Sequence, residues 1–377
     1  MTDTIQLRKT LHQFPELSGY EAETAQRISA FLKRYMPDEL ITNVGGSGIL
    51  AIYSPNSYYR RTIVFRCELD ALPIQEVNEF DHKSQRENVS HKCGHDGHMA
   101  IMCELAKRLS NQRPLGTRVV LLFQPAEENG AGAVAIYGDA RFKSLEPDKV
   151  FALHNLPGYP LHEIVIKDHT FTCAVNSIII KLHGRTSHAG EPEKGDNPAL
   201  AIAGIIQQYN SLIQPDSRKE KFTILTPIYI NMGTENYGIS AGYGEVHYTF
   251  RRAANDEMKE LEAQLEHIAR SVATKYNLRL EISWTQRFSA NENSPGAADI
   301  VRSAARACGY QLTEREAPFQ WGEDFGLFTE HYEGAMFGLG SGIETSALHN
   351  PDYDFPDEII STGAGIFHKI VELIDAQ

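Results

Sequence analysis

The sequence predicts an α/β fold in which a large domain with a mostly parallel sheet is interrupted by a smaller inserted domain. Three observations support this prediction. The chain has 377 residues, which is more than one hydrophobic core usually supports. Short apolar runs alternate with helical segments through the first part of the chain, and the middle part follows the order β-α-β-β-α-β. Alternating strands and helices are typical of a buried, mostly parallel sheet.

The large domain is expected to begin with a helix, because Ala25, Ile28, Phe31 and Leu32 recur at helical spacing. Apolar runs typical of buried strands follow it, at 49–53, 62–65, 118–123 and 149–153. Helical segments are expected between these strands, at 98–109 and 131–143. Residues 1–174 are therefore predicted to form the first part of the large domain.

The inserted domain is expected to begin with a strand at 176–182. Asn197 and Pro198 then open a helix, with Pro198 at its first position. Two strands follow, at 222–230 and 244–250. A long helix comes next, with Met258, Leu261, Leu265, Ile268 and Val272 on one face, and a last strand lies at 278–284. This is the order of a ferredoxin-like domain. We place it at 175–288, and expect 289–377 to complete the large domain.

The composition is that of an acidic globular protein, with 42% hydrophobic and 23% charged residues. Lys and Arg number 36 against 49 Asp and Glu, a net charge of −13. With no basic run to offset that charge, nucleic acid is not an expected partner. No stretch approaches the ~20 apolar residues that span a bilayer, and the first residues lack the apolar core of a signal peptide. We expect a cytoplasmic protein with no membrane partner.

The densest group of potential metal ligands is HKCGHDGH, at residues 91–98. Thiolate, imidazole and carboxylate are the ligands that suit Zn²⁺ and its neighbours. Gly94 and Gly97 would let the backbone turn, so that side chains apart in sequence converge. The alternative is a polar loop with incidental histidines, but so many ligand types in one segment favour a metal site. The five cysteines are odd in number and scattered, which favours free thiols over disulfides.

Three other segments carry polar residues where apolar runs end: ELDALP (68–73), QPAEE (124–128) and ALHNLP (152–157). A fourth, SALHNP (346–351), lies near the C-terminus. Functional residues of α/β sheets gather beyond the carboxyl ends of the strands. In QPAEE, one carboxylate can bind a metal while the other stays free as a general base. The alternatives are a solvated helix start for the two glutamates and hydrogen-bonded surface histidines for His154 and His349. Asp70 is placed to orient a ligand.

Seven segments occur in an order that resembles a known family: RKTLHQFPEL, CELDALP, HKCGHDGH, FQPAEE, SHAGEP, GEDF and LHNP. Together they resemble the aminoacylase/hippurate hydrolase branch of the M20 metallopeptidase clan, which includes auxin-conjugate amidohydrolases. The resemblance extends from about residue 5 to about residue 370. It implies two divalent metal ions per subunit, held by Cys93, His95, Glu128, His154 and His349. It also implies that Glu127 is the general base and that Asp70 supports the metal ligands.

The resemblance extends to the inserted domain. It implies that His188 polarises the scissile carbonyl from a partner subunit, and that Asn236 and Arg251 hold the carboxylate of the substrate. Two positions depart from the pattern. Glu68 stands where this branch usually has Asp, and NYGIS (236–240) replaces the usual NVIP. These departures bear on the surroundings of the metals and on the choice of substrate.

The expected function is hydrolysis of the amide bond of a small N-acyl amino acid by a homodimer that closes its inserted domain as a lid. The metal could be Zn²⁺, Mn²⁺, Co²⁺ or Ni²⁺. One alternative is a dipeptidase or carboxypeptidase with the same metal site. Another is a non-catalytic protein that binds a metal or an amino acid, although such a protein has no use for a free Glu127 beside Glu128.

Overall fold

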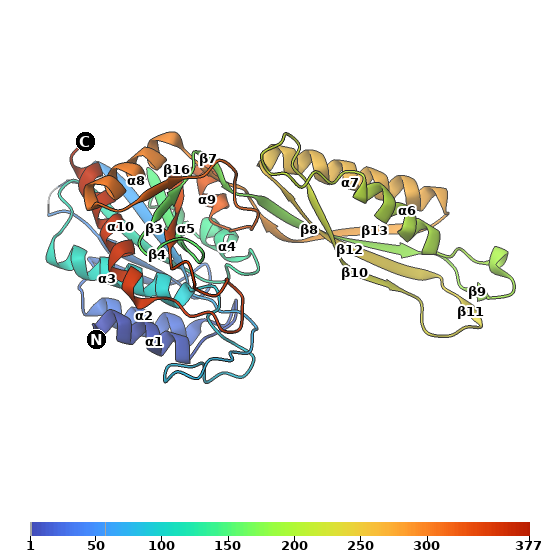
Figure 1. Ribbon diagram of the computed structural model, residues 1–377, viewed down its shortest axis with the longest axis horizontal. Helices are drawn as coiled ribbons and strands as arrows, with labels where there is room; N and C mark the ends of the chain where they lie inside the picture. Colours follow the sequence, from blue (N-terminus) through green and yellow to red (C-terminus); the bar gives the residue numbers. More distant parts are fainter. Residues whose placement is uncertain (1, 57) are drawn as a thin grey trace. The chain divides into compact units, whose positions relative to one another are not determined.

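The computed structural model describes residues 2–56 and 58–377, which divide into two units (Figure 1). Unit 1 comprises Met1–Phe171, Asn291–Glu316 and Glu323–Gln377. Unit 2 comprises Thr172–Ala290 and Ala317–Gly322. Ala317–Gly322 thus lies in unit 2, whereas the sequence predicts that all of 289–377 returns to the large domain.

Unit 1 is built around an eight-stranded sheet with the order β1-β2-β4-β3-β5-β16-β6-β15. Its strands are β1 (Glu39–Val44), β2 (Gly48–Tyr53), β3 (Arg61–Glu68), β4 (Thr117–Gln124), β5 (Lys149–Leu156), β6 (Ile164–Ile166), β15 (Leu312–Glu314) and β16 (Glu333–Gly340). The four central strands, β4, β3, β5 and β16, are parallel to one another. β1 and β2 add an antiparallel edge. The α/β class with a mostly parallel sheet is therefore confirmed.

Helices cover both faces of this sheet, which explains why its central strands are buried along almost their whole length. On β4, Val119, Leu121 and Phe123 pack into the core formed with α1, α2, α3, α8 and α10, while Val120 and Leu122 face the other side. The helices of unit 1 are α1 (Asp3–Gln13), α2 (Ala22–Lys33), α3 (His95–Asn111), α4 (Gly132–Gly138), α5 (Ala140–Lys143), α8 (Pro295–Cys308), α9 (Gly326–His331) and α10 (Ile360–Asp375), with a 3-10 turn η2 (Asp357–Ile359). β7 (His169–Thr172) and β14 (Asn291–Asn293) pair separately.

Unit 2 has a four-stranded antiparallel sheet with the order β10-β12-β8-β13. Its elements are β8 (Ala174–His183), β9 (Ser187–His188), η1 (Pro192–Lys194), α6 (Ala199–Asn210), β10 (Ile224–Met232), β11 (Ile239–Ser240), β12 (Tyr243–Arg252), α7 (Asn255–Lys275) and β13 (Arg279–Phe288). Along β12, alternate residues are buried against α6 and α7. β9 and β11 form a separate pair at one end of the unit (Figure 1).

Two local predictions were wrong. The helix predicted at 131–143 is divided into α4 and α5 at Asp139, whose backbone is extended and whose side chain accepts a hydrogen bond from the Arg141 amide. Asp139 thereby caps a new helix. Pro198 precedes the first residue of α6 and is not itself that residue. No helix among the described residues has both the length and the apolar character needed to cross a membrane.

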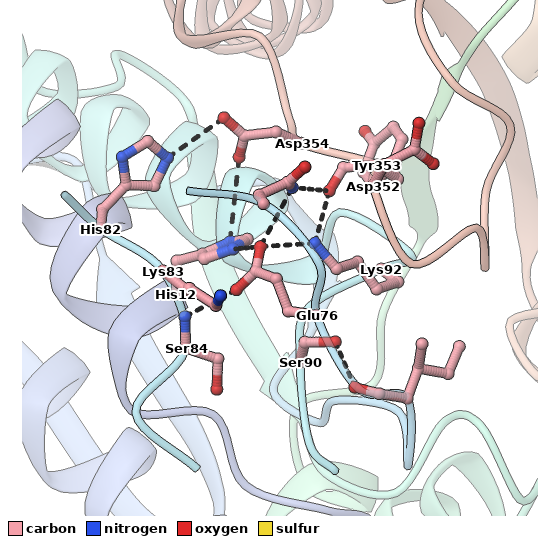
Figure 2. Close-up of polar contacts among 12 residues, drawn as sticks. His12, Glu76, His82, Lys83, Ser84, Ser90, Lys92, Asp352, Tyr353 and Asp354 are labelled. Atoms are coloured by element: carbon pink, nitrogen blue, oxygen red, sulfur yellow. Dashed lines mark hydrogen bonds and ion pairs between the residues drawn. The ribbon is translucent and has the colours of Figure 1, made fainter. Parts of the chain in front are cut away.

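His12 of α1 lies in a buried group of charged side chains (Figure 2). Its Nδ1 is 2.9 Å from Asp96 and its Nε2 is 3.0 Å from Glu76. Arg8, one turn earlier, pairs with Asp96 at 3.1 Å and with Asp354 at 2.8 Å. Burial alone would lower the pKa of His12, but the two carboxylates outweigh it and raise the pKa to about 9.

This raised pKa predicts that the protein loses stability at alkaline pH. The contribution of His12 is fully present below its ordinary pKa of 6.5 and is lost as the pH rises through about 9. A shift of this size corresponds to roughly 3 kcal/mol of unfolding free energy. Denaturant unfolding at pH 6 and pH 9.5 should show this loss, and His12→Gln should reduce it. An equal loss in both proteins would contradict the assignment.

Candidate metal centre

Residues from several central strands meet at the carboxyl edge of the unit 1 sheet. Glu68 ends β3 and lies opposite Gln124, the last residue of β4. Asp70 follows β3, and Glu127 and Glu128 follow β4. His154 lies near the end of β5, paired with Gly338 of β16. Since parallel strands end at a common edge, side chains distant in sequence are brought together there.

The segment that carries Cys93 and His95 turns sharply at Gly94. Gly94 has φ +96, a left-handed conformation that favours glycine. A Cβ atom here would also lie 2.7 Å from the Asn155 Oδ1 atom. α3 begins at the next residue, His95. The turn therefore lets the thiol before Gly94 and the imidazole after it approach the end of β5 together.

The five predicted ligands form two groups that share Cys93. One group is Cys93, His95 and His154, and the other is Cys93, Glu128 and His349. Within each group the candidate ligand atoms all lie within 4.8 Å of one another. Cys93 Sγ is 3.5 Å from His154 Nε2, and His349 Nε2 is 3.9 Å from Glu128 Oε1. One thiol between two sets of nitrogen and oxygen donors suits two divalent cations.

The hydrogen bonds around these groups leave donor atoms free for a metal. His95 Nδ1 donates to the Asp70 carbonyl at 2.9 Å, and His154 Nδ1 donates to the Asn155 carbonyl at 2.9 Å. A proton on Nδ1 leaves the Nε2 lone pair of His95 available. His95 Nε2 and Glu128 Oε1 are buried and have no hydrogen-bond partner among the described residues. Such buried unpaired atoms are costly unless they bind something, so the donor set fits a metal.

The electrostatics of the site also favour cations. Burial, with repulsion from Glu128 and Glu127, raises the pKa of the Cys93 thiol well above its ordinary range. Burial raises the pKa of Glu128 to about 7, against the lowering effect of His95. Burial and the neighbouring Glu323 raise the pKa of Glu127. The site thus holds more acidic groups than its own cations balance, and divalent cations would supply the missing charge.

Glu127 is buried and belongs to neither group that contains Cys93. Its Oε2 atom is 3.9 Å from His95 Nε2. Glu127 belongs to two other groups of candidate ligands. One contains His95 and Glu128, and the other contains Glu323 and Asp324. Because both glutamates can reach a position near His95, the division of their roles into base and ligand stays a prediction.

Asp70 connects three parts of the site. Its Oδ2 atom accepts hydrogen bonds from Ser18 Oγ at 2.7 Å and from the Glu128 amide at 3.0 Å. Its carbonyl holds His95, and its Oδ1 atom is 3.5 Å from His95 Nδ1. The hydrogen bonds of Asp70 therefore agree with a supporting role for this carboxylate.

The sequence motifs assign no role to His98 or to Arg66. His98 Nδ1 is 2.7 Å from Glu68, and its Nε2 is 2.6 Å from Asn155 Oδ1. The buried Arg66 guanidinium contacts Glu68, Glu323 and Asp324. Glu68, the residue that departs from the family pattern, thus contacts both His98 and Arg66. The only sequence signal was the spacing of His98, which stands three residues after His95 on one face of a helix.

The three predicted residues of the inserted domain all lie in unit 2. His188 of β9 is exposed and pairs with Ile239 of β11. Its Nδ1 accepts a hydrogen bond from the Gly190 amide at 3.0 Å, which leaves an Nε2–H as a donor. Asn236 lies in the turn before β11, where its Oδ1 accepts from the Gly238 amide at 3.1 Å. His188 and Asn236 are therefore parts of one small β structure.

Arg251 is placed at the far end of unit 2 from this small β structure. β12 runs from Tyr243, near the start of β9, to Arg251 opposite Val175, eight residues further on. At ~3.4 Å per residue this distance is roughly 27 Å. Burial lowers the pKa of Arg251, which has no carboxylate ion-pair partner in the described part of the chain. One subunit therefore does not bring Arg251 together with His188 and Asn236.

The chain was compared with known families, sequences and structures. The model of "Peptidase family M20/M25/M40" matches residues 64–373. A Staphylococcus haemolyticus protein described as an uncharacterized hydrolase is 29% identical, over 97% of this chain and 96% of its own. An N-acetyldiaminopimelate deacetylase of Streptococcus pneumoniae is also 29% identical, over 96% of each chain.

A solved structure has the same fold. It is a Bacillus subtilis protein described as a dinuclear metal binding peptidase from the M20 family, with a TM-score of 0.85 and 24% identity. The match covers 99% of this chain and 98% of that one. Because the family match spans most of the chain and the candidate ligands meet at one edge of the sheet, this protein belongs to peptidase family M20/M25/M40 and is a hydrolase.

Proposed function

We propose that this protein is a binuclear metal-dependent amidohydrolase that cleaves the amide bond of a small N-acyl amino acid. The products would be a carboxylic acid and an amino acid. The observation that supports the proposal most strongly is the arrangement of five donors in two groups around Cys93. The similarity to an N-acetyldiaminopimelate deacetylase supports an N-acyl amino acid as the substrate class.

In this proposal Cys93, His95, Glu128, His154 and His349 hold the two ions. Bound there, the ions would make a water molecule more acidic near neutral pH and withdraw charge from the scissile carbonyl. The Glu127 carboxylate accepts the proton of the attacking water and passes it to the nitrogen of the leaving amine. The planar Arg251 guanidinium pairs with the α-carboxylate of the substrate.

In this proposal His188 of a partner subunit donates a hydrogen bond, from its Nε2–H, to the oxygen of the scissile carbonyl. The length of β12 from Tyr243 to Arg251, roughly 27 Å, separates Arg251 from the small β structure that holds His188 and supports this part of the proposal, because residues of one subunit so far apart do not contact the same small substrate. The same separation extends the proposal to Asn236, which would also act across the dimer.

We further propose that unit 2 is a ferredoxin-like lid that forms the dimer. Within the described residues, β10 pairs with β12 along one edge and with no strand along the other. Its exposed side chains include Ile228, Tyr229, Ile230 and Met232. An apolar edge strand of this kind favours pairing with a second copy. All five cysteines are free thiols, which supports a cytoplasmic location.

The proposal is tested by release of free amino acid from a panel of substrates. The panel contains N-acetyl, N-benzoyl and indole-acyl amino acids, N-acetyldiaminopimelate and dipeptides, each assayed with added Zn²⁺, Mn²⁺, Co²⁺ or Ni²⁺. We expect N-acyl amino acids to be cleaved and chelation to stop the reaction. Cleavage of dipeptides alone would make the protein a peptidase. No metal-dependent turnover with any substrate would favour a binding protein.

The proposed role of His188 predicts complementation between two inactive variants. His188→Ala should lose about 10²–10³-fold in activity while both metals remain bound. Random mixing with Glu127→Gln subunits should restore about a quarter of wild-type activity, because half of the dimers then contain one intact site. His183→Ala, in the same unit, serves as the control with full activity. Lack of recovery despite demonstrated subunit exchange would contradict action across the dimer.

A further inference from the structure

The segment that carries His349 has no regular secondary structure. It extends from residue 341 to residue 356, between β16 and the turn η2, and we call it the His349 segment. The His349 side chain is 51% exposed, so burial does not fix its position. Its backbone has φ +66, an uncommon conformation for a residue other than glycine. Contacts from outside the segment are therefore needed to hold His349 near Cys93 and Glu128.

Lys92 supplies two of these contacts. Its carbonyl accepts a hydrogen bond from the His349 amide at 2.8 Å. Its side-chain Nζ donates to the Tyr353 carbonyl at 2.7 Å, four residues further along the His349 segment. Lys92 also directly precedes Cys93. A single residue thus joins the start of the Cys93 turn to both ends of the stretch 349–353.

The Lys92 side chain is completely buried, and Glu76 holds it in place. Figure 2 shows its Nζ atom between Glu76 Oε1, at 2.5 Å, and the Tyr353 carbonyl. Glu76 is fixed in turn by the Ser84 amide at 2.6 Å and by His12 at 3.0 Å. A buried ammonium group is retained only where such partners compensate for its lost hydration. The position of the Lys92 side chain is therefore determined by its hydrogen bonds to Glu76 and to the Tyr353 carbonyl.

The other metal group does not depend on these contacts. His95 begins α3 and is held by the Asp70 carbonyl, and His154 lies in β5 and is held by its neighbour's carbonyl. Both histidines are thus parts of regular elements. Cys93 precedes α3 and is common to both groups, so the groups differ because only one of them also relies on the His349 segment.

We propose that Lys92 is a positioning residue that sets the second metal position, formed by Cys93, Glu128 and His349. Through its buried contacts it places His349 against the Cys93 turn, without touching metal or substrate. The inference rests on the proposed two-metal function. The group Cys93, His95 and His154 keeps its geometry when Lys92 is replaced.

The test compares Lys92→Met with two control variants. Arg302→Met removes an ion-pairing guanidinium of α8 that binds Asp168, Asp299 and Glu314, so it perturbs unit 1 outside the candidate ligands. Lys83→Met removes an exposed pair with Glu79, at 3.3 Å, near Glu76 in sequence. Lys92→Met with Glu76→Gln removes both charges of the buried pair, and it replaces the single variant if that does not fold.

The first measurement is titration of the metal-free full-length protein with Co²⁺, by calorimetry and visible absorption. The parent should bind two equivalents. In Lys92→Met the second equivalent should be weakened at least about tenfold, and the first should be little changed. Unchanged affinity for both equivalents would overturn the inference. So would an equal loss of both, since that is the pattern of general destabilisation expected for Arg302→Met.

The second measurement is hydrogen exchange of peptides from residues 341–356 in the metal-free protein. Lys92→Met should speed exchange in these peptides selectively, whereas Arg302→Met and Lys83→Met should not. Unchanged exchange in Lys92→Met would overturn the inference even if metal binding fell. A parent that binds one Co²⁺ would refute the proposed two-metal function, and the exchange result alone would then decide whether Lys92 positions His349.

Discussion

Glu127→Gln should lose nearly all amidase activity and keep both metals. Removal of a general base typically costs about 10²–10⁴-fold in rate. Glutamine has nearly the same volume but accepts no proton from water. Glu127 lies outside the two groups that share Cys93, so its amide should leave the donors of both groups in place.

The fold should tolerate this substitution. Burial and repulsion from Glu323 raise the pKa of Glu127, so its surroundings disfavour the charged carboxylate, and glutamine carries no charge. The measurements are metal content by mass spectrometry, single-turnover rate and thermal unfolding of the metal-free form. Glu128→Gln is the matched control, and it should lose metal. A Glu127→Gln protein without metal would reverse the roles of the two glutamates.

Cys93→Ala should lose both metal ions, because both groups contain its Sγ atom. Loss of a supporting partner costs about 10–100-fold in metal affinity, so loss of a shared ligand should exceed ~100-fold at each position. Activity should fall with metal content. Equilibrium dialysis against Zn²⁺ or Mn²⁺ measures the effect.

Cys103→Ala is the matched control for this variant. Cys103 is as fully buried as any residue of α3 but belongs to none of the metal-binding groups found among the described residues. It should bind two ions with normal affinity. If Cys93→Ala retains one ion at full affinity, the thiol serves a single position and the two groups are not bridged by it.

Much of the fold could be predicted because its strands are buried on both faces. The runs at 49–53, 62–65, 118–123 and 149–153 correspond to β2, β3, β4 and β5, which are buried along almost their whole length. β6, β14 and β15 have only three residues each and left no periodic signal. The division of the helix at Asp139 depends on a side-chain cap, and a periodic pattern does not reveal it.

The candidate site was predictable to a similar degree. Motifs predicted five ligands, because metals require particular atoms at particular places, and the structure brings these five residues into two groups. They did not show how the ligands are grouped, since that depends on which strand ends are neighbours. The roles of Arg66 and Lys92 could not be predicted either. Buried ion pairs such as Lys92 with Glu76 join residues 16 positions apart, and Arg66 with Asp324 joins residues 258 positions apart.

The pairing of β9 with β11 has a consequence for how this protein could diversify. The segment NYGIS, which departs from the family pattern, includes β11, and its Ile239 and Ser240 are the strand partners of His188 and Ser187. A mutation that reshapes this turn would therefore shift the imidazole and the Asn236 amide together. Binding of the substrate carboxylate and polarisation of the carbonyl, the roles proposed for Asn236 and His188, would then be inherited as one trait, and selection for a new substrate would act on both at once.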